Sequence, residues 1–230
     1  MWILAFGIRL YSNFSQELLF GNGGYYPLQV RAILERGTLA FPDMPFLFYL
    51  DAGVVKLISF FGFAITDDLI LNTVKFMDSL LFPLILLPAY QLLKRMNRRT
   101  TYWFLVAIVA YLTISILPLR FVFSFQKNGF ALMLLFSSFT YFVLYHREEK
   151  RKYLIIASIL LLLTGATHFG TFMFASIAIS IFLLHRYKWK ALMYIGALAI
   201  VAVSLVFLID VERGTRIVEF LGATITAKGL

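Results

Sequence analysis

Long apolar tracts separated by short basic clusters are the feature that most constrains this chain. The tracts cover residues 69–93, 101–118, 129–145 and 189–209. Each reaches or approaches the roughly 20 apolar residues that a helix needs to cross a bilayer. Hydrophobic residues make up 61% of the chain and charged residues 14%, and the mean hydropathy is +0.84. These values exclude an ordinary soluble domain and indicate an all-α membrane protein.

The basic clusters predict how the helices are oriented. Lysine and arginine near the ends of spans are retained on the cytoplasmic side, so we expect all the clusters to face the cytoplasm. This arrangement explains the net charge of +9 without nucleic acid as a partner. The clusters are Lys94, Arg95, Arg98 and Arg99, then Arg147, Lys150, Arg151 and Lys152, and finally Arg186, Lys188 and Lys190.

The same rule divides the apolar stretch at residues 153–184. A single span there would place the cluster around Arg186 on the wrong side of the membrane, whereas two shorter passes keep it in the cytoplasm. We expect the turn between the passes at residues 164–171, "TGATHFGT", where two glycines and a histidine interrupt the apolar run near the outer surface.

The start of the chain predicts a short span followed by a large extracytoplasmic segment. Residues 1–11 fit an anchor and not a signal peptide, because they lack a Lys/Arg-rich start and a small-residue cleavage site. Residues 45–63 fit a helix lying in the membrane interface, because Asp51, Lys56 and Ser59 fall within an arc of about 140° on such a helix.

The predicted fold is therefore a single all-α unit over residues 1–230. It is a polytopic transmembrane helical bundle of about seven spans, whose large first extracytoplasmic loop contains interfacial helices. The mixed segment after residue 209 leads us to expect a fragment of a longer chain. The chain has no cysteine and three histidines, which exclude thiolate metal sites and argue against zinc chemistry.

Several stretches resemble the GT-C superfamily of membrane glycosyltransferases. "YYPLQVRAILERG", "PDMPFLFYL" and "DDLILNTVKFMDSLLFPLILLPAYQLLKR" look like the first outer loop and second span of that family. "SFQKNGFALMLLFSSFTYFVLY" and "LLTGATHFGTFMF" resemble the fourth span and the fifth-to-sixth hairpin of bacterial members. The residues at matching places in the first loop are Tyr26, Arg31, Gly37, Pro45, Phe46 and Tyr49.

The resemblance implies transfer of a sugar from a polyprenyl-phosphate-linked donor to an acceptor at the outer face of a bacterial inner membrane. Such a site needs a lipid-facing groove, cations for the phosphate and a carboxylate that acts as general base on the acceptor. Membrane lipids are then natural partners. No metal site or certain cofactor follows from the residues, although some members of the family hold a divalent cation with oxygen ligands.

The sequence departs from the family pattern at the expected carboxylate, because Asn22 stands about where the first-loop aspartate belongs. An amide cannot act as a base, so Asn22 is assigned to substrate binding or to a left-handed turn. Asp43 is the favoured catalytic base, since it lies where the loop re-enters the interface, although Asp43 also fits a turn or helix cap. The other nearby carboxylates are Glu17, Glu35, Asp67 and Asp68, of which Asp67 and Asp68 fit the N-terminus of the next helix.

Cations and one histidine complete the candidate site. Arg31, Arg120 and Lys127 are candidates to bind the donor phosphate together with Tyr26, although a solvated helix face and lipid headgroups are alternative reasons for these cations. His168 is assigned a catalytic role because it lies at the outer turn of the predicted hairpin, where a hydrogen-bonded structural role is also open.

A small-solute or lipid transporter is the main alternative function. Lys75 and Asp78 are three residues apart inside an apolar tract, where they could pair and mark an ion pathway. A non-catalytic membrane subunit is the third possibility.

Overall fold

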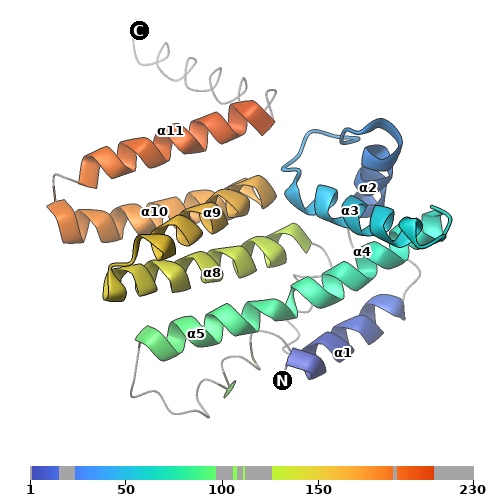
Figure 1. Cartoon of the computed structure of the whole chain (residues 1–230), viewed down its shortest axis with the longest axis horizontal. Helices are drawn as coiled ribbons and strands as arrows, with labels where there is room; N and C mark the ends of the chain where they lie inside the picture. The colour runs from blue at the N-terminus through green and yellow to red at the C-terminus, as the bar shows by residue number, and fades with distance from the viewer. Residues whose placement is uncertain are drawn as a thin grey trace, which may run out of the picture.

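A computed structural model describes residues 2–15, 24–96, 106–107, 111, 126–188 and 191–209. Every regular element within these ranges is a helix, which confirms the predicted all-α class for this part of the chain. Most of the helices lie side by side, and the two helices at residues 25–36 and 46–60 cover one end (Figure 1). The helices are α1 (Trp2–Phe14), α2 (Tyr25–Arg36), α3 (Phe46–Phe60), α4 (Asp67–Leu81), η1 (Pro83–Ile85), α5 (Leu86–Met96), α8 (Gln126–Glu148), α9 (Arg151–Thr167), α10 (Phe169–Tyr187) and α11 (Ala191–Ile209).

Two stretches of the described chain are long and apolar enough to cross a membrane. The first runs through α4, η1 and α5 over Asp67–Arg95, and the second is α8, Gln126–Glu148. Pro83 begins the short 3-10 helix that interrupts the first stretch, because proline lacks the backbone donor that a continuous α-helix requires. These two stretches match two of the predicted spans. The tract at residues 101–118 and the segment after residue 209 lie outside the described residues.

The helix ends sort into two groups. The last turns of α5, α8 and α10 and the first turn of α9 lie at one end of the molecule, and α2, α3 and the first turns of α4 and α8 lie at the other (Figure 1). Arg147 of α8 donates to the backbone oxygen of Arg95 at the end of α5, which ties two basic helix ends together. The described parts of the basic clusters therefore share one end of the bundle.

The apolar stretch at residues 153–184 is broken into two helices, as predicted. α9 ends at Thr167 and α10 begins at Phe169, so the break falls at His168. The two helices pack against each other and against α8. The predicted hairpin is confirmed as a pair of helices.

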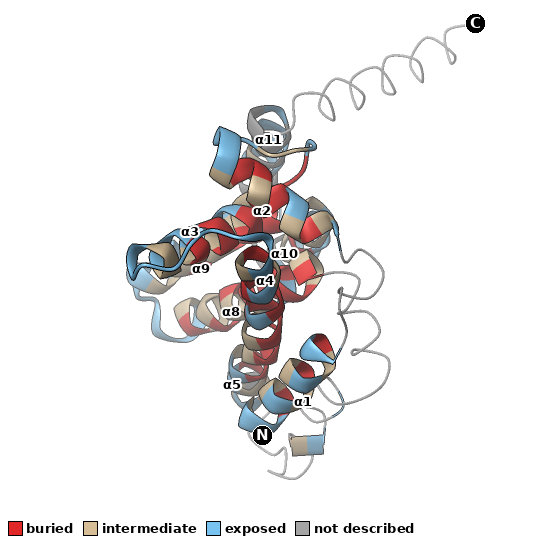
Figure 2. Ribbon diagram, turned by 90° about the vertical axis from the view of Figure 1, so that its right-hand side faces the viewer, coloured by how far each residue is buried: buried red, intermediate tan, exposed pale blue. Residues whose placement is uncertain are grey.

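The core at the end opposite the basic clusters is formed by α2, α3, α4 and α8. Val30, Phe48, Val55 and Val74, from the first three of these helices, are fully buried there. Figure 2 shows buried residues along α2, α3 and α4, with exposed residues facing outward. Residues 46–60 form the expected helix, but the polar residues of the predicted arc do not share one exposed face. Asp51 lies in the buried face of α3, whereas Lys56 is exposed.

Candidate functional site

The loop between α2 and α3 holds Asp43 in a defined position. α2 ends at Gly37, whose positive φ of 76° reverses the chain. The buried Gln29 then binds the loop backbone: its Oε1 accepts from the Ala40 and Phe41 amides at 2.8 and 3.3 Å, and its Nε2 donates to the Phe41 carbonyl at 3.0 Å. These bonds satisfy backbone groups of the loop that have no partner in a helix or strand. Asp43 Oδ1 accepts from the Met44 amide at 2.7 Å, which orients the carboxylate.

Five side chains form what we call the Asp43 cluster: Tyr25, Tyr26 and Gln29 from α2, Asp43 from the loop, and Lys127 from the first turn of α8. The Lys127 ammonium and the Tyr25 hydroxyl both bind Asp43 Oδ2. Gln29 Nε2 donates to the Tyr25 hydroxyl at 3.1 Å, and the Lys127 amide donates to the Tyr26 hydroxyl at 3.4 Å. The fold thus brings together Tyr26, Asp43 and Lys127, three of the predicted site residues.

The cluster is almost enclosed, and its electrostatics favour an ionised carboxylate. Burial raises the pKa of Asp43, but the hydrogen bonds from Lys127 and Tyr25 and the charge of Lys127 outweigh this, so the net pKa lies below the ordinary value. Burial also raises the pKa of Tyr26, so its hydroxyl stays neutral. The Lys127 ammonium lies 5.8 and 5.5 Å from the ring centres of Tyr25 and Phe48, within the range of cation–π attraction.

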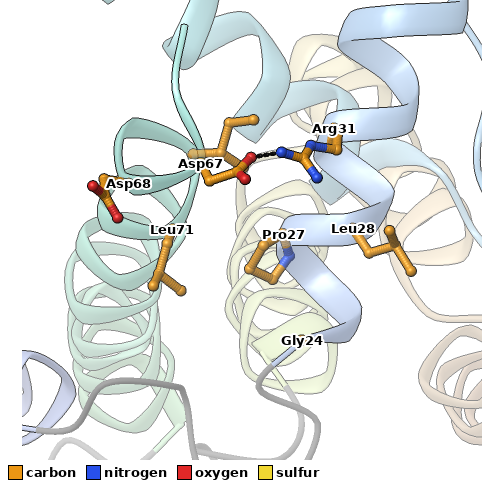
Figure 3. Close-up of a pocket in the computed structure, with 8 residues that line it drawn as sticks. Gly24, Pro27, Leu28, Arg31, Asp67, Asp68 and Leu71 are labelled. Carbon is orange, nitrogen blue, oxygen red and sulfur yellow. Dashed lines mark ion pairs between the residues drawn. The ribbon is translucent and has the colours of Figure 1, made fainter.

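Arg31 belongs to a separate pocket on another face of α2. It lies two residues after Gln29, about 200° further around the helix axis. A cavity of about 240 Å³ opens there between α2 and α4, and Figure 3 shows Arg31 paired with Asp67 across it. Arg31 also lies 3.6 Å from Glu35. The structure therefore does not place Arg31 beside Asp43 and Lys127.

The N-terminus of α4 is capped by Thr66. Its Oγ1 accepts from the Leu69 amide at 3.2 Å, so the capping residue precedes Asp67. Asp67 and Asp68 occupy the first turn, where their negative charges interact favourably with the positive end of the helix dipole. Asp67 was predicted to cap this helix, but Thr66 is the cap. Asp67 and Asp68 have the predicted favourable position in the first turn.

His168 caps α10. Its Nδ1 accepts from the Thr171 amide at 3.1 Å and lies 2.8 Å from the Thr171 hydroxyl. The turn that carries it lies at the same end of the bundle as α2 and α3 (Figure 1). The structure therefore shows a capping role for His168, which the sequence had left open. The residue lies at the same end of the bundle as the Asp43 cluster, which is where a catalytic role would require it.

A second polar cluster, which sequence reasoning missed, joins α1 to α4. Arg9 binds both carboxylate oxygens of Asp78 at 2.8 and 2.7 Å, and Asn13 Nδ2 donates to Asp78 at 2.9 Å and to Ser79 at 2.8 Å. The guanidinium also lies 4.4 Å from the centre of the Phe82 ring. The sequence offered Lys75, three residues away in the same helix, as one partner for Asp78, whereas the contacts that the structure shows come from Arg9 and Asn13 on α1. Arginine in an apolar first segment was the available signal.

Asn22, Arg120 and Glu17 lie outside the described residues. Sequence reasoning also missed Tyr25 and Gln29. The doubled tyrosine was a signal for the first, but nothing in the sequence distinguishes Gln29. Across the described ranges, no group of three or more His, Asp or Glu side chains lies close enough to hold a metal ion. Comparisons of the chain with protein-family models, with curated proteins and with solved structures found no match.

Proposed function

We propose that the protein transfers a sugar from a polyprenyl-phosphate-linked donor to an acceptor, at the membrane face opposite the basic helix ends. The observation that carries this proposal is the Asp43–Lys127 pair, a carboxylate and a cation held together at that end of the bundle. On this proposal the chain is a GT-C-like bundle of about seven spans. It resides in a bacterial inner membrane with its active face outside the cytoplasm.

The two side chains have complementary tasks in such a reaction. The acceptor hydroxyl or amine attacks the anomeric carbon as the bond from that carbon to the phosphate oxygen breaks. Asp43 accepts the proton that the acceptor loses. The electron pair of the broken bond leaves with the polyprenyl phosphate, whose added negative charge Lys127 stabilises. Inversion at the anomeric carbon follows from this single displacement.

Donor binding also activates the base. With no substrate, Lys127 lowers the pKa of Asp43 and makes it a weak proton acceptor. A phosphate that attracts Lys127 removes part of this interaction, so the proton affinity of Asp43 rises as the donor binds. Tyr25 remains as a hydrogen-bond donor that holds the carboxylate in place.

Two variants separate these tasks. Asp43→Asn should abolish transfer from labelled polyprenyl-phosphate hexoses and pentoses in proteoliposomes. It should bind polyprenyl phosphate at least as tightly as the wild type, because the amide competes less for Lys127. Lys127→Met should weaken binding of polyprenyl phosphate about tenfold or more, since a charged hydrogen bond contributes about 1.5–3 kcal/mol. Glu148→Gln, at the basic end, is the matched control.

Full transfer by Asp43→Asn would contradict the base assignment. If no donor of the panel reacts while polyprenyl phosphate still binds in a Lys127-dependent way, the protein is a lipid-binding subunit or carrier. The buried Arg9–Asp78 pair favours the carrier as a second candidate function, because ionisable groups within membrane segments commonly mark transport pathways. Movement of polyprenyl phosphate between leaflets that is lost in Asp78→Asn protein shown to be folded would support that alternative.

A further inference from the structure

Asp51 is a buried carboxyl group that neither the Asp43 cluster nor the Arg9–Asp78 pair uses. It lies in the middle of α3, with 0% of its surface exposed. Neither of its oxygens has a hydrogen-bond partner among the described residues. A buried polar group normally has such a partner, because leaving it unpaired costs several kcal/mol, on the order of 2–7.

Both Asp51 and a second unpaired group line one small cavity. The cavity measures about 10 Å³ and lies between α3, α4 and α8. Gln126, in the first turn of α8, lines it as well, and its Nε2 is buried without a partner among the described residues. Asp78 and the apolar side chains of Leu47 and Phe130 complete the wall on the other sides. This volume is at the lower limit for one water molecule, which needs about 10–15 Å³.

Among the described residues, the charges around Asp51 do not provide a counter-ion. The carboxylate of Asp78 on α4 lines the same cavity, and its charge is balanced by Arg9. Lys127 on α8 is paired with Asp43, and Tyr26 on α2 is neutral. Burial, followed by the negative charge of Asp78, raises the pKa of Asp51 well above its ordinary value. An ionised Asp51 would be a second negative charge in a cavity that Asp78 also lines.

We propose that Asp51 is a proton-binding site, in which the neutral carboxylic acid is linked through one enclosed water to Gln126. The acid form donates its O–H to the water and accepts a hydrogen bond from Gln126 or from the same water. Both orphaned groups are satisfied in this arrangement. The site is independent of the proposed sugar transfer.

The position of Gln126 connects this proton to the Asp43 cluster. Gln126 directly precedes Lys127 in the first turn of α8. Loss of the proton would place a new charge beside the turn from which Lys127 reaches Asp43.

Infrared spectroscopy of the intact protein in nanodiscs tests this proposal. The wild type at pH 7 should show the C=O stretch of a protonated carboxyl group, shifted in D₂O, and Asp51→Asn should lose this band. Asp68→Asn, which removes an exposed acid of the first turn of α4, should keep it. Gln126→Leu should retain the band at a higher frequency, because the acid loses one hydrogen-bond partner.

The Gln126→Leu variant keeps the proposal testable even where Asp51→Asn fails to fold. A wild-type spectrum at pH 7 without the protonated-carboxyl band would overturn the proposal. A band that survives in Asp51→Asn would assign the proton to another group. If Na⁺ raises the melting temperature at constant ionic strength and Asp51→Asn abolishes this effect, the site takes a metal cation and not a proton.

Discussion

At the scale of single residues, the Arg9–Asp78 pair is a buried ion pair that joins α1 to α4. Both side chains are almost completely buried, and the guanidinium is bound by the carboxylate and by the Phe82 ring. Removing one partner leaves an uncompensated charge, so Asp78→Asn or Arg9→Met should each lower the free energy of unfolding by about 3–5 kcal/mol.

The double variant Arg9→Met/Asp78→Leu should cost less than either single variant, because it removes both charges together. Unfolding in mixed micelles measures all three. Single variants that cost under about 1 kcal/mol would mean that water reaches the pair and screens it.

Asp43 predicts a pH-dependent stability. Its pKa in the folded protein lies below the ordinary value, so the unfolded chain binds the proton more readily. The stability that Asp43 contributes is therefore present above the ordinary aspartate pKa of about 3.9 and is lost as the pH falls through the lower, folded value. The stability advantage of the wild type over Asp43→Asn should shrink as the pH falls below about 4. A constant difference would contradict the Lys127 pairing.

For Asp51, we expect the opposite dependence of stability on pH. Its raised pKa means that the folded protein keeps the proton longer than the unfolded chain. The stability of the wild type should then fall as the pH rises from the ordinary aspartate value through the folded one, whereas Asp51→Asn should stay level over that range. Melting temperatures across a pH series measure both variants.

Two variants of His168 distinguish a capping role from a catalytic role. His168→Ala removes the side chain that accepts from the Thr171 amide, so it should cost about 1 kcal/mol of stability. Asparagine also caps helices well, so His168→Asn should restore that stability. If His168 acts in transfer, His168→Asn will be stable but slow. Equal recovery of stability and transfer would leave His168 as a cap alone.

At the scale of helices, Gly129 determines how closely α8 approaches the break after α4. A Cβ atom on Gly129 would lie 2.5 Å from Phe82, so the ring would have to move, and the Arg9 guanidinium lies against that ring. Gly129→Ala should destabilise the protein by about 1–3 kcal/mol through overpacking. Gly196→Ala in α11, which meets nothing within 4 Å, is the matched control and should be neutral or slightly stabilising.

The positions of the helices were largely predictable from the sequence. Which face of each helix is buried was harder to predict. The break between α9 and α10 followed from charge placement and two glycines, and both helices formed as expected. The polar residues of α3 were expected on one face, but Asp51 is buried and Lys56 is exposed. Periodicity assigns residues to a common face by angle alone. It cannot detect that Asp51 packs toward a cavity shared with α4 and α8.

The candidate site shows the same limit. Asp43, Tyr26 and Lys127 were each chosen from the sequence, but nothing in the spacing indicated that they meet, because Lys127 and Asp43 are 84 residues apart. The sequence offered Asp78 a partner in its own helix, because i,i+3 geometry is local, whereas the partner that the structure shows, Arg9, is 69 residues away. Long-range pairing of this kind is decided by how helices pack.

At the scale of the whole molecule, the two ends of the bundle differ in charge and in chemistry. Lys94 and Arg95, Arg147 and the basic start of α9 gather at one end, and the Asp43 cluster lies at the other (Figure 1). Two stretches within the described ranges have the length and apolar composition of membrane spans. If these stretches span a membrane, we expect the basic end to face the cytoplasm and the Asp43 cluster to face outward.

Cysteine accessibility tests this orientation, and the absence of cysteine from the chain provides a clean background. Single cysteines replace Gly24 and Gly170, exposed residues near the Asp43 end, and Lys150 and Lys188, near the basic end. A fifth at Arg98 reports on the first basic cluster. A membrane-impermeant reagent added to intact cells should label Gly24→Cys and Gly170→Cys alone, and cell lysis should expose the other three. Labelling confined to Gly170→Cys would place the α2–α3 segment inside the cell, separate Asp43 from an outer-face donor, and favour the carrier over the transferase.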